Sequence, residues 1–344
     1  MPLYLGLDIH SKWSTISGFD SETGNIVTND RIGNDTESLT KFFSNLDGPI
    51  HGVMEAGTNA WAMYRRMQPF FETLTVVDPK IWSQELNRGA KTDKRDAFKL
   101  AVKLSRSEIE GIYVPDEQTQ ENRNLLRSKI NFTQEATRIS NQITSMLRSL
   151  GYTMPHRVMS KKGRQVIEET KQELSEMNRE MLEIHLELLD KVLESEAKLN
   201  AKINEIASKD ETCRILMTIP DVGSFTAFAL KAEIGDISRF RTPQALISYC
   251  GLCPTVYSSG GKTSYGRLTK MCNRVLRYVL ILRVSGMTRQ PNTNPLKKAY
   301  LRGLYKSHAN NGKLNMARKL VRIIFAMLSR GEAWNPRPTE PCPT

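Results

Sequence analysis

The chain has 344 residues, of which 39% are hydrophobic and 25% charged, and it carries a formal net charge of +12. This length suits two or three domains. No apolar run reaches the roughly 20 residues of a membrane span, and the first residues lack the pattern of a signal peptide. The five sparse cysteines are typical of a reducing compartment. We therefore expect a cytoplasmic protein with no membrane partner.

The first 110 residues or so alternate short apolar strands with amphipathic helices. Expected strands lie at 3–8, 13–19, 25–28, 53–55 and 74–77, and expected helices at 36–46, 60–71 and from 92 or 93 to 104. Only a short polar turn separates the first two strands, so they predict a β-hairpin. A hairpin sheet followed by strand–helix alternation predicts an α/β domain of ribonuclease H type.

Four carboxylates mark the ends of these elements. Asp8 closes one apolar run and Glu55 closes another, while Asp93 and Asp96 stand three residues apart on one face of a helix start. Carboxylates gathered at one point disfavour each other's ionisation, and a hard divalent cation removes that conflict. The pattern predicts a magnesium site for phosphoryl transfer. The alternative for each acid alone is a cap or turn residue.

Residues from about 117 to 207 are nearly all helix formers. Apolar side chains recur every three or four residues in two runs, from 132 to 150 and from 182 to 206, with a break at 151–155. We predict two long helices in an antiparallel hairpin or coiled coil, which would space two domains or pair protomers. Simple core packing is the alternative explanation of such stripes.

Positive charge is concentrated in the C-terminal third. Between Asp236 and Glu332 there is no acidic residue, and the same stretch holds 18 lysines and arginines. An ordinary solvated face mixes both signs, so this segment predicts a surface that binds nucleic-acid phosphates. The nucleic-acid-binding candidates on it are Lys262, Arg267, Lys270, Arg274 and Arg277.

A mostly helical region from about 210 to 332 opens with a helix, a tight turn and a second helix start at 215–224. This pattern looks like a helix–hairpin–helix element, in which backbone N–H groups at Gly223 and the helix start would bind phosphate. Asp221 stands where such hairpins usually have their first glycine. Because an acid is poor for phosphate binding, a plain helical corner is the alternative.

A segment rich in serine, glycine and lysine, 257–267, lies inside the acid-free stretch. Its glycines predict a flexible loop. A serine hydroxyl beside Lys262 and Arg267 could attack a phosphodiester and conserve the bond energy in a phosphoserine. A linker or a phosphate-binding loop is the commoner use of such a segment.

Cysteine and histidine spacing gives little sign of a zinc site. Cys250 and Cys253 form a C-x-x-C pair, and Cys272 could be a third ligand, but no fourth ligand follows close to it. We therefore expect buried thiols instead of zinc. The five histidines are scattered without metal-like spacing, and no glycine-rich nucleotide-binding loop is present.

Six motifs in this order resemble the DEDD-type transposases of bacterial insertion sequences, the group that includes the Piv-like DNA invertases. They are the segments 6–8, 54–58, 91–97, 219–223, 249–254 and 258–267. The resemblance spans nearly the whole chain, whereas a RuvC-like nuclease would share only the acids.

The resemblance implies three domains and a catalytic set. The expected domains are a RuvC-like domain of ribonuclease H fold at 1–112, a helical coiled-coil linker and dimerisation region at 113–207, and a mostly α-helical transposase domain at 208–332, with a disordered tail at 333–344. The implied metal ligands are Asp8, Glu55, Asp93 and Asp96. A serine nucleophile that precedes a glycine maps best to Ser259, and Ser258 and Ser264 stay open as alternatives.

The resulting expectation is a Mg²⁺-dependent DNA recombinase of the bacterial cytoplasm that acts on the element ends and a target. Some family members are guided by a structured RNA, and the basic C-terminal region fits RNA and DNA equally. Because recombination joins two duplexes, we expect a homodimer or homotetramer. The alternatives are a metal-only nuclease, an invertase with the same chemistry, and a nucleic-acid-binding architectural protein with a dead site.

Overall fold

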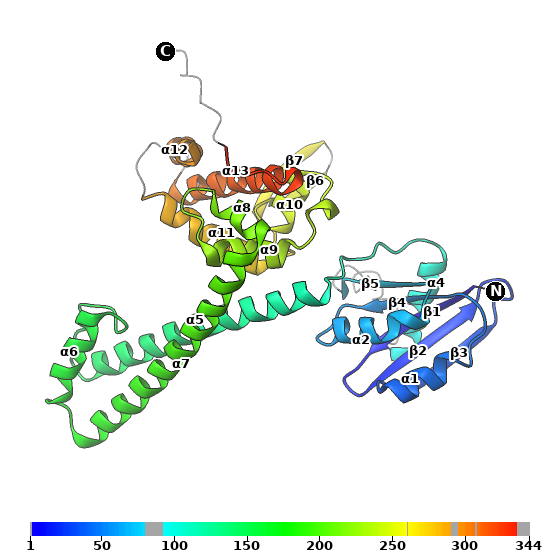
Figure 1. The fold of residues 1–344 in the computed structure, drawn as a ribbon, viewed down its shortest axis with the longest axis horizontal. Coiled ribbons are helices and arrows are strands. Elements are labelled where there is room, and N and C mark those ends of the chain that lie inside the picture. Colours follow the sequence, from blue (N-terminus) through cyan, green and yellow to red (C-terminus); the bar gives the residue numbers. More distant parts are fainter. Residues whose placement is uncertain (1, 80–91, 260, 290–294, 307, 336–344) are drawn as a thin grey trace, which may run out of the picture. The chain divides into compact units, whose positions relative to one another are not determined.

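The computed structural model describes residues 2–79, 92–259, 261–289, 295–306 and 308–335 (Figure 1). It divides into two compact units, Met1–Asp116 and Glu117–Thr344. Within the described ranges, no helix is long and apolar enough to cross a membrane. The expected tail at 333–344 falls outside these ranges from residue 336 onward.

The first unit is built on a five-stranded sheet of order β3-β2-β1-β4-β5. Its strands are β1 (Leu3–Ile9), β2 (Trp13–Asp20), β3 (Ile26–Gly33), β4 (Ile50–Glu55) and β5 (Thr73–Val77). β1, β2 and β3 pair antiparallel, whereas β4 runs parallel to β1, and β5 parallel to β4. The predicted hairpin and the third strand are therefore confirmed, and the strand–helix alternation adds the two parallel strands.

Helices cover both faces of this sheet. They are α1 (Thr36–Phe43), α2 (Ala60–Met67), continued by the 3₁₀ turn η1 (Gln68–Phe70), and α4 (Asp93–Ser105). Leu5 and Leu7 of β1 belong to the apolar core that also holds Leu39 of α1 and Met63 of α2. On the opposite face, Val53 of β4 packs with Leu100 of α4. The unit is therefore a three-layer α/β structure, as the alternation of elements predicts.

Gly6 lets α4 approach the sheet closely. A Cβ atom at this position would lie 1.8 Å from the Ala97 carbonyl oxygen and 3.1 Å from the Ala101 nitrogen. Only glycine leaves room for backbone against backbone here. Gly6 therefore sets the height at which the helix start passes over the end of β1.

Two long helices, α5 (Glu117–Ser149) and α7 (Glu176–Lys209), open the second unit. They run antiparallel, side by side (Figure 1), and bury an apolar seam of Ala136, Ile139, Ile143, Leu147, Leu182, Leu186 and Leu189. Glu196 of α7 accepts a hydrogen bond from Thr133 of α5 at 2.8 Å. The predicted pair of long helices is confirmed. Between them lies a further helix, α6 (Lys161–Lys171), whose Ile167 joins the same seam.

The rest of the second unit packs around one large core. Its elements are α8 (Glu211–Met217), α9 (Ser224–Ile234), the 3₁₀ turn η2 (Ile237–Arg239), α10 (Pro243–Tyr249), β6 (Pro254–Ser259), β7 (Lys262–Leu268), α11 (Arg274–Met287), α12 (Pro295–Lys306) and α13 (Ala309–Arg330). Leu126 of α5 and Ile203 of α7 share this core with Phe228 of α9. The separate domains expected at 113–207 and 208–332 thus lie within one unit, and their boundary stays a proposal.

The serine-rich segment is a β-hairpin instead of a flexible loop. β6 and β7 pair antiparallel from Ser259↔Lys262 back to Pro254↔Leu268. Gly261 makes the turn with φ +77°, a conformation that favours glycine. The flanking residues, Val256, Tyr257, Thr263 and Tyr265, are aromatic or β-branched and fit a pleated strand. The glycines therefore serve the turn while these neighbours specify the strands.

Candidate metal centre and nucleic-acid interface

Asp8 and Glu55 stand at the same edge of the sheet because β1 and β4 are parallel neighbours. Their register pairs Gly6 with Val53 and ends at Leu7↔Met54, so Asp8 and Glu55 are the next residues on each strand. Side chains alternate between the faces of a sheet, which puts both acids on the α4 side with Gly6 and Val53. The fold thus assembles two of the predicted ligands from strand ends.

The start of α4 supplies the other two acids. Thr92 is its N-cap, and the Thr92 hydroxyl accepts a hydrogen bond from the Arg95 nitrogen at 3.4 Å. Asp93 and Asp96 occupy the first turn, where the helix dipole favours negative charge. Since Gly6 brings α4 close to β1, this turn passes near the end of the strand that carries Asp8.

Asp8 and Asp93 meet around the imidazole of His10. His10 Nε2 lies 3.4 Å from Asp8 Oδ2 and 3.3 Å from Asp93 Oδ2, and the side chains of Asp8, His10 and Asp93 are 32%, 37% and 59% exposed. One potential ligand atom from each residue falls within 4.8 Å of the others. Carboxylate oxygens and an imidazole nitrogen are donors that divalent cations accept. The residues present therefore fit a divalent metal.

Glu55 and Asp96 are not members of this group of close donor atoms. Both are half-buried, Glu55 at the end of β4 and Asp96 in the first turn of α4. The group formed by close donor atoms among the described residues holds Asp8, His10 and Asp93. The structure thus brings two of the four predicted ligands into contact distance of one imidazole and puts the other two on the neighbouring strand end and helix turn.

His10 is the residue that sequence reasoning missed. Its backbone nitrogen donates to the Trp13 carbonyl at 3.0 Å, and its carbonyl accepts from Asn34 Nδ2 at 2.8 Å and Asn59 Nδ2 at 2.9 Å. The available signal was local, an Asp-x-His sequence at the strand end. Because no second histidine stands at metal-binding spacing from His10, histidine pairs in the sequence do not reveal it.

The three candidate serines lie on the exposed hairpin of the second unit. Ser259 ends β6 and pairs in register with Lys262, whereas Ser264 pairs with Tyr257. Ser258 pairs with Thr263, and their hydroxyl oxygens are 3.5 Å apart. Ser259 is therefore the serine nearest the turn. The side chain of Lys262 lies outside the described part of the structure.

The basic candidates have two kinds of surroundings. Arg267, Lys270 and Arg274 are exposed, and Arg267 lines a hollow of about 420 Å³ together with Arg318. Arg277 instead donates through Nη2 to the Thr269 carbonyl, which ties α11 to the turn after the hairpin. The exposed three are therefore available to phosphate, while Arg277 also braces the fold.

Like charges crowd on α12 and α13 in the acid-free stretch. The pKa of Lys319 is lowered by burial and by the nearby cations Arg302 and Lys298. Cations that raise each other's energy are stabilised when a polyanion binds. This crowding agrees with a phosphate-binding surface.

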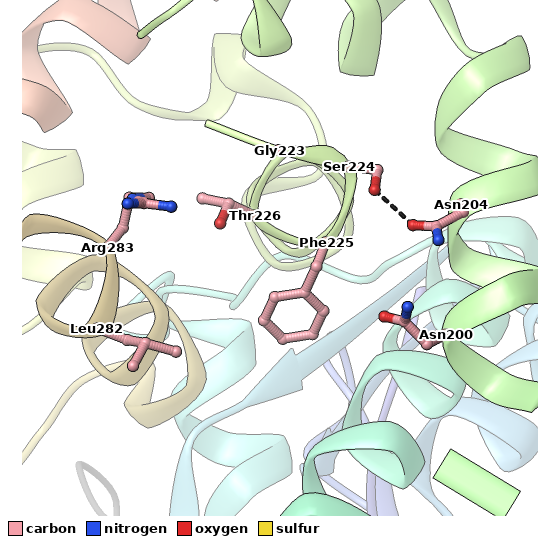
Figure 2. Close-up of a pocket in the computed structure, with 8 residues that line it drawn as sticks. All are labelled: Asn200, Asn204, Gly223, Ser224, Phe225, Thr226, Leu282 and Arg283. Atoms are coloured by element: carbon pink, nitrogen blue, oxygen red, sulfur yellow. Dashed lines mark hydrogen bonds between the residues drawn. The ribbon is translucent and has the colours of Figure 1, made fainter. Parts of the chain in front are cut away.

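The turn of the predicted helix–hairpin–helix element lies between α8 and α9. Asp221 has φ +64°, a left-handed conformation that glycine usually takes. Gly223 is the N-cap of α9 and receives no side-chain cap. Gly223, Ser224 and Phe225 line a hollow of about 490 Å³. Figure 2 shows these residues together at the start of α9. The helix start thus borders open space, as an anion site at this corner requires.

Cys250 is a buried thiol, as expected, whereas Cys253 and Cys272 are partly exposed. Burial raises the pKa of Cys250 to about 12, with a smaller contribution from Cys272. Among the described residues, these cysteines do not form a group of close metal-ligating atoms.

Comparison with known proteins gives one consistent family. A family model of IS110-type DEDD transposases matches residues 5–151, and a model of the IS116/IS110/IS902 transposase family matches 213–301. The transposase for insertion sequence element IS1111A of Coxiella burnetii is 26% identical, covering 96% of this chain and 90% of its own length. A probable family 20 transposase of Pseudomonas aeruginosa is 24% identical, covering 96% of this chain and 98% of its own length. The chain therefore belongs to the IS110 family of DEDD transposases.

Proposed function

We propose that this DNA transposase cuts and rejoins strands with Mg²⁺ held by Asp8, Glu55, Asp93 and Asp96 and with Ser259 as the nucleophile. The observation that carries the metal site is the convergence of Asp8 and Asp93, 85 positions apart in sequence, on a single imidazole nitrogen. Two carboxylates held this close repel each other, and a divalent cation between them would remove that repulsion. The strand order and the acids at adjacent strand ends support a RuvC-like domain of ribonuclease H fold.

In this proposal the four carboxylates hold the metal and Ser259 attacks the phosphodiester. A bound divalent cation stabilises the charge of a phosphodiester under attack and of the departing oxygen. Ser259 Oγ forms a bond to phosphorus, the bond from phosphorus to the leaving strand breaks, and the serine proton passes to solvent. The phosphoserine conserves the bond energy until a strand end from the other site attacks it. Ser258 and Ser259 are both exposed, so what supports Ser259 is its place directly before the turn, whereas the Ser258 hydroxyl lies 3.5 Å from that of Thr263.

The acid-free surface of the second unit supplies the DNA contacts in this proposal. Arg267, Lys270 and Arg274 bind the backbone beside the hairpin, and the uncapped start of α9 at Gly223 binds a phosphate. The element ends and the target are the DNA partners. A structured guide RNA would use the same phosphate-binding chemistry.

Pairing of two copies is supported by a stripe on α7. The exposed apolar side chains on this helix are Met177, Met181, Ile184 and Leu188. Their spacing of four, three and four residues is that of a coiled-coil seam, and helical periodicity puts them on the side of α7 away from the face that packs on α5. We propose that this stripe contributes to a homodimer or a homotetramer.

The test is a covalent adduct assay. Purified protein is incubated with Mg²⁺ and DNA that carries the element junction, with and without RNA transcribed from the element ends, and the products are denatured. We expect a protein–DNA adduct with wild type and with Ser258→Ala, its matched neighbour, and none with Ser259→Ala or Asp8→Asn.

Two results would overturn parts of this proposal. Cleavage without an adduct, equal in wild type and Ser259→Ala, would establish a metal-only nuclease in which water attacks. An adduct that persists in Ser259→Ala and disappears in Ser258→Ala or Ser264→Ala would move the nucleophile along the hairpin.

A further inference from the structure

We infer that His10 is a direct nitrogen ligand of the divalent cation in the first unit, and that it makes this site favour Mn²⁺ over Mg²⁺. The inference deepens the proposed function and rests on its metal site. It adds a ligand beyond the four carboxylates.

The imidazole of His10 brings Nε2 close to both carboxylates. His10 Nε2 is buried as an atom and has no hydrogen-bond partner among the described residues, although Asp8 Oδ2 and Asp93 Oδ2 lie 3.4 Å and 3.3 Å away. Both contacts therefore have the separation of an ion pair without hydrogen-bond geometry. An unsatisfied buried nitrogen is costly, and a shared cation would satisfy it together with both carboxylates.

The donor atoms of His10, Asp8 and Asp93 are spaced like the ligands of one cation. Ligands held about 2.0–2.2 Å from one cation lie roughly 3–3.5 Å from each other. The distances from His10 Nε2 to the two carboxylate oxygens fall in this range. The three donors thus have the mutual separation of ligands in one coordination sphere.

The fold holds His10 in place. Its carbonyl receives two side-chain amides, from Asn34 and Asn59, and its ring lies beside Trp13 with the ring centroids 5.7 Å apart. Asn59 comes from the N-cap of α2 and Asn34 from the end of β3. Three separate segments of the first unit therefore fix a residue that a solvent-exposed turn would leave free.

A nitrogen ligand changes which cation the site prefers. Mg²⁺ strongly favours oxygen ligands, whereas imidazole suits softer divalent metals, so replacing an oxygen by His10 costs Mg²⁺ more than Mn²⁺. The occupant class is therefore a divalent metal that accepts mixed nitrogen and oxygen donors. Mg²⁺ remains able to occupy such a site at a higher concentration.

The experiment uses the full chain and Mn²⁺ as the probe. Pulsed electron paramagnetic resonance detects coupling of bound Mn²⁺ to a ligand nitrogen, and calorimetry gives the Mn²⁺ and Mg²⁺ affinities. The variants are His10→Gln, Asp8→Asn and the matched control His185→Ala, which removes a histidine whose Nδ1 lies 2.8 Å from the Met181 carbonyl on α7.

We expect nitrogen coupling in wild type and in His185→Ala, and its loss in His10→Gln. We also expect His10→Gln to weaken Mn²⁺ binding about tenfold or more and Mg²⁺ binding by less. Bound Mn²⁺ that shows no nitrogen coupling in wild type, but that Asp8→Asn abolishes, would overturn the role of His10 and leave the carboxylate site standing.

Other outcomes concern the site as a whole. Failure of wild type to bind Mn²⁺, or binding that Asp8→Asn leaves unchanged, would overturn both the inference and the metal site of the proposed function. The wild-type spectrum decides the question even if His10→Gln folds poorly.

Discussion

Two acid-centred clusters, one in each unit, have opposite surroundings. In the second unit, Glu233 of α9 is 0% exposed and accepts hydrogen bonds from Arg127 Nε at 3.0 Å, Arg127 Nη2 at 3.1 Å and Asn273 Nδ2 at 2.7 Å. In the first unit, Asp8 and Asp93 are partly exposed and share an imidazole nitrogen.

We propose that the difference separates a structural acid from a functional one. Glu233 accepts hydrogen bonds from Arg127 of α5 and from Asn273, which is also the N-cap of α11. This acid of α9 therefore ties three helices together. A buried carboxylate of this kind is tolerated only with its partners in place. Asp8 and Asp93 instead come together at an open edge, where a cation can enter.

The largest expected effect is a loss of DNA cleavage when an acid of the partly exposed Asp8–Asp93 cluster is replaced. Asp8→Asn removes one charge of the proposed metal site and should lower DNA cleavage by about 10³-fold or more, since bound metal contributes several kcal/mol to such reactions. Chelation of divalent metal should have a similar effect. Thermal unfolding should change little, because the substitution also relieves repulsion between carboxylates. A large fall in melting temperature with cleavage retained would show that Asp8 stabilises the fold and is not needed for cleavage.

In the buried cluster around Glu233, a substitution should instead lower the stability of the fold. Glu233→Ala removes a fully buried acid that binds Arg127 and Asn273 and lies 3.8 Å from the buried Arg123, and it should lower the free energy of unfolding by about 3–5 kcal/mol. Denaturant unfolding measures this, with Glu205→Ala on the exposed surface of α7 as the control. An unfolding free energy within 1 kcal/mol of wild type would show that the network contributes little to the fold.

A third substitution tests how α4 is held over β1. Gly6→Ala puts a methyl group against the Ala97 carbonyl and should cost about 1–3 kcal/mol of stability. Because α4 must shift, metal affinity should fall together with stability. Gly24→Ala is a useful contrast, since nothing lies within 4 Å of that position although its φ is +70°. Unchanged metal affinity in Gly6→Ala would show that metal binding does not depend on how closely α4 approaches β1.

The smallest expected effect is at the cap of the same helix. Thr92→Ala removes the acceptor for the Arg95 nitrogen and should destabilise the first unit by about 1 kcal/mol or less, as the bond is long at 3.4 Å. Thr92→Ser should restore most of this loss. Equal unfolding midpoints for the three proteins would show that the cap does not hold the two acids of the first turn.

Much of the first unit is predictable because its signals are local. The apolar runs specify β1 and β4, and an acid at the end of each run needs only their parallel pairing to share one edge. Thr92 is likewise recognisable as a cap from its place before the helix. Order and spacing along the chain were therefore enough to predict the α/β class of the first unit and the positions of the four acids at strand ends and a helix start.

The parts that were missed depend on contacts that the sequence does not display. Arg127 and Glu233 are 106 residues apart, so no spacing rule connects them. His10 gains its importance only when α4 brings Asp93 to it. The β6–β7 hairpin was taken for a loop because the glycines of its turn outweighed the β-prone residues beside them.

The central claim is that Asp8, Glu55, Asp93 and Asp96 surround one divalent cation. The most direct measurement replaces the metal by Fe²⁺ in the full-length protein, generates hydroxyl radicals with ascorbate and peroxide, and maps the cuts in the polypeptide by mass spectrometry. We predict cuts near residues 8–10, 55 and 93–96, all suppressed by excess Mg²⁺ or Mn²⁺ and by Asp8→Asn. Cuts at only one of these segments, or cuts that Asp8→Asn leaves unchanged, would contradict a shared site.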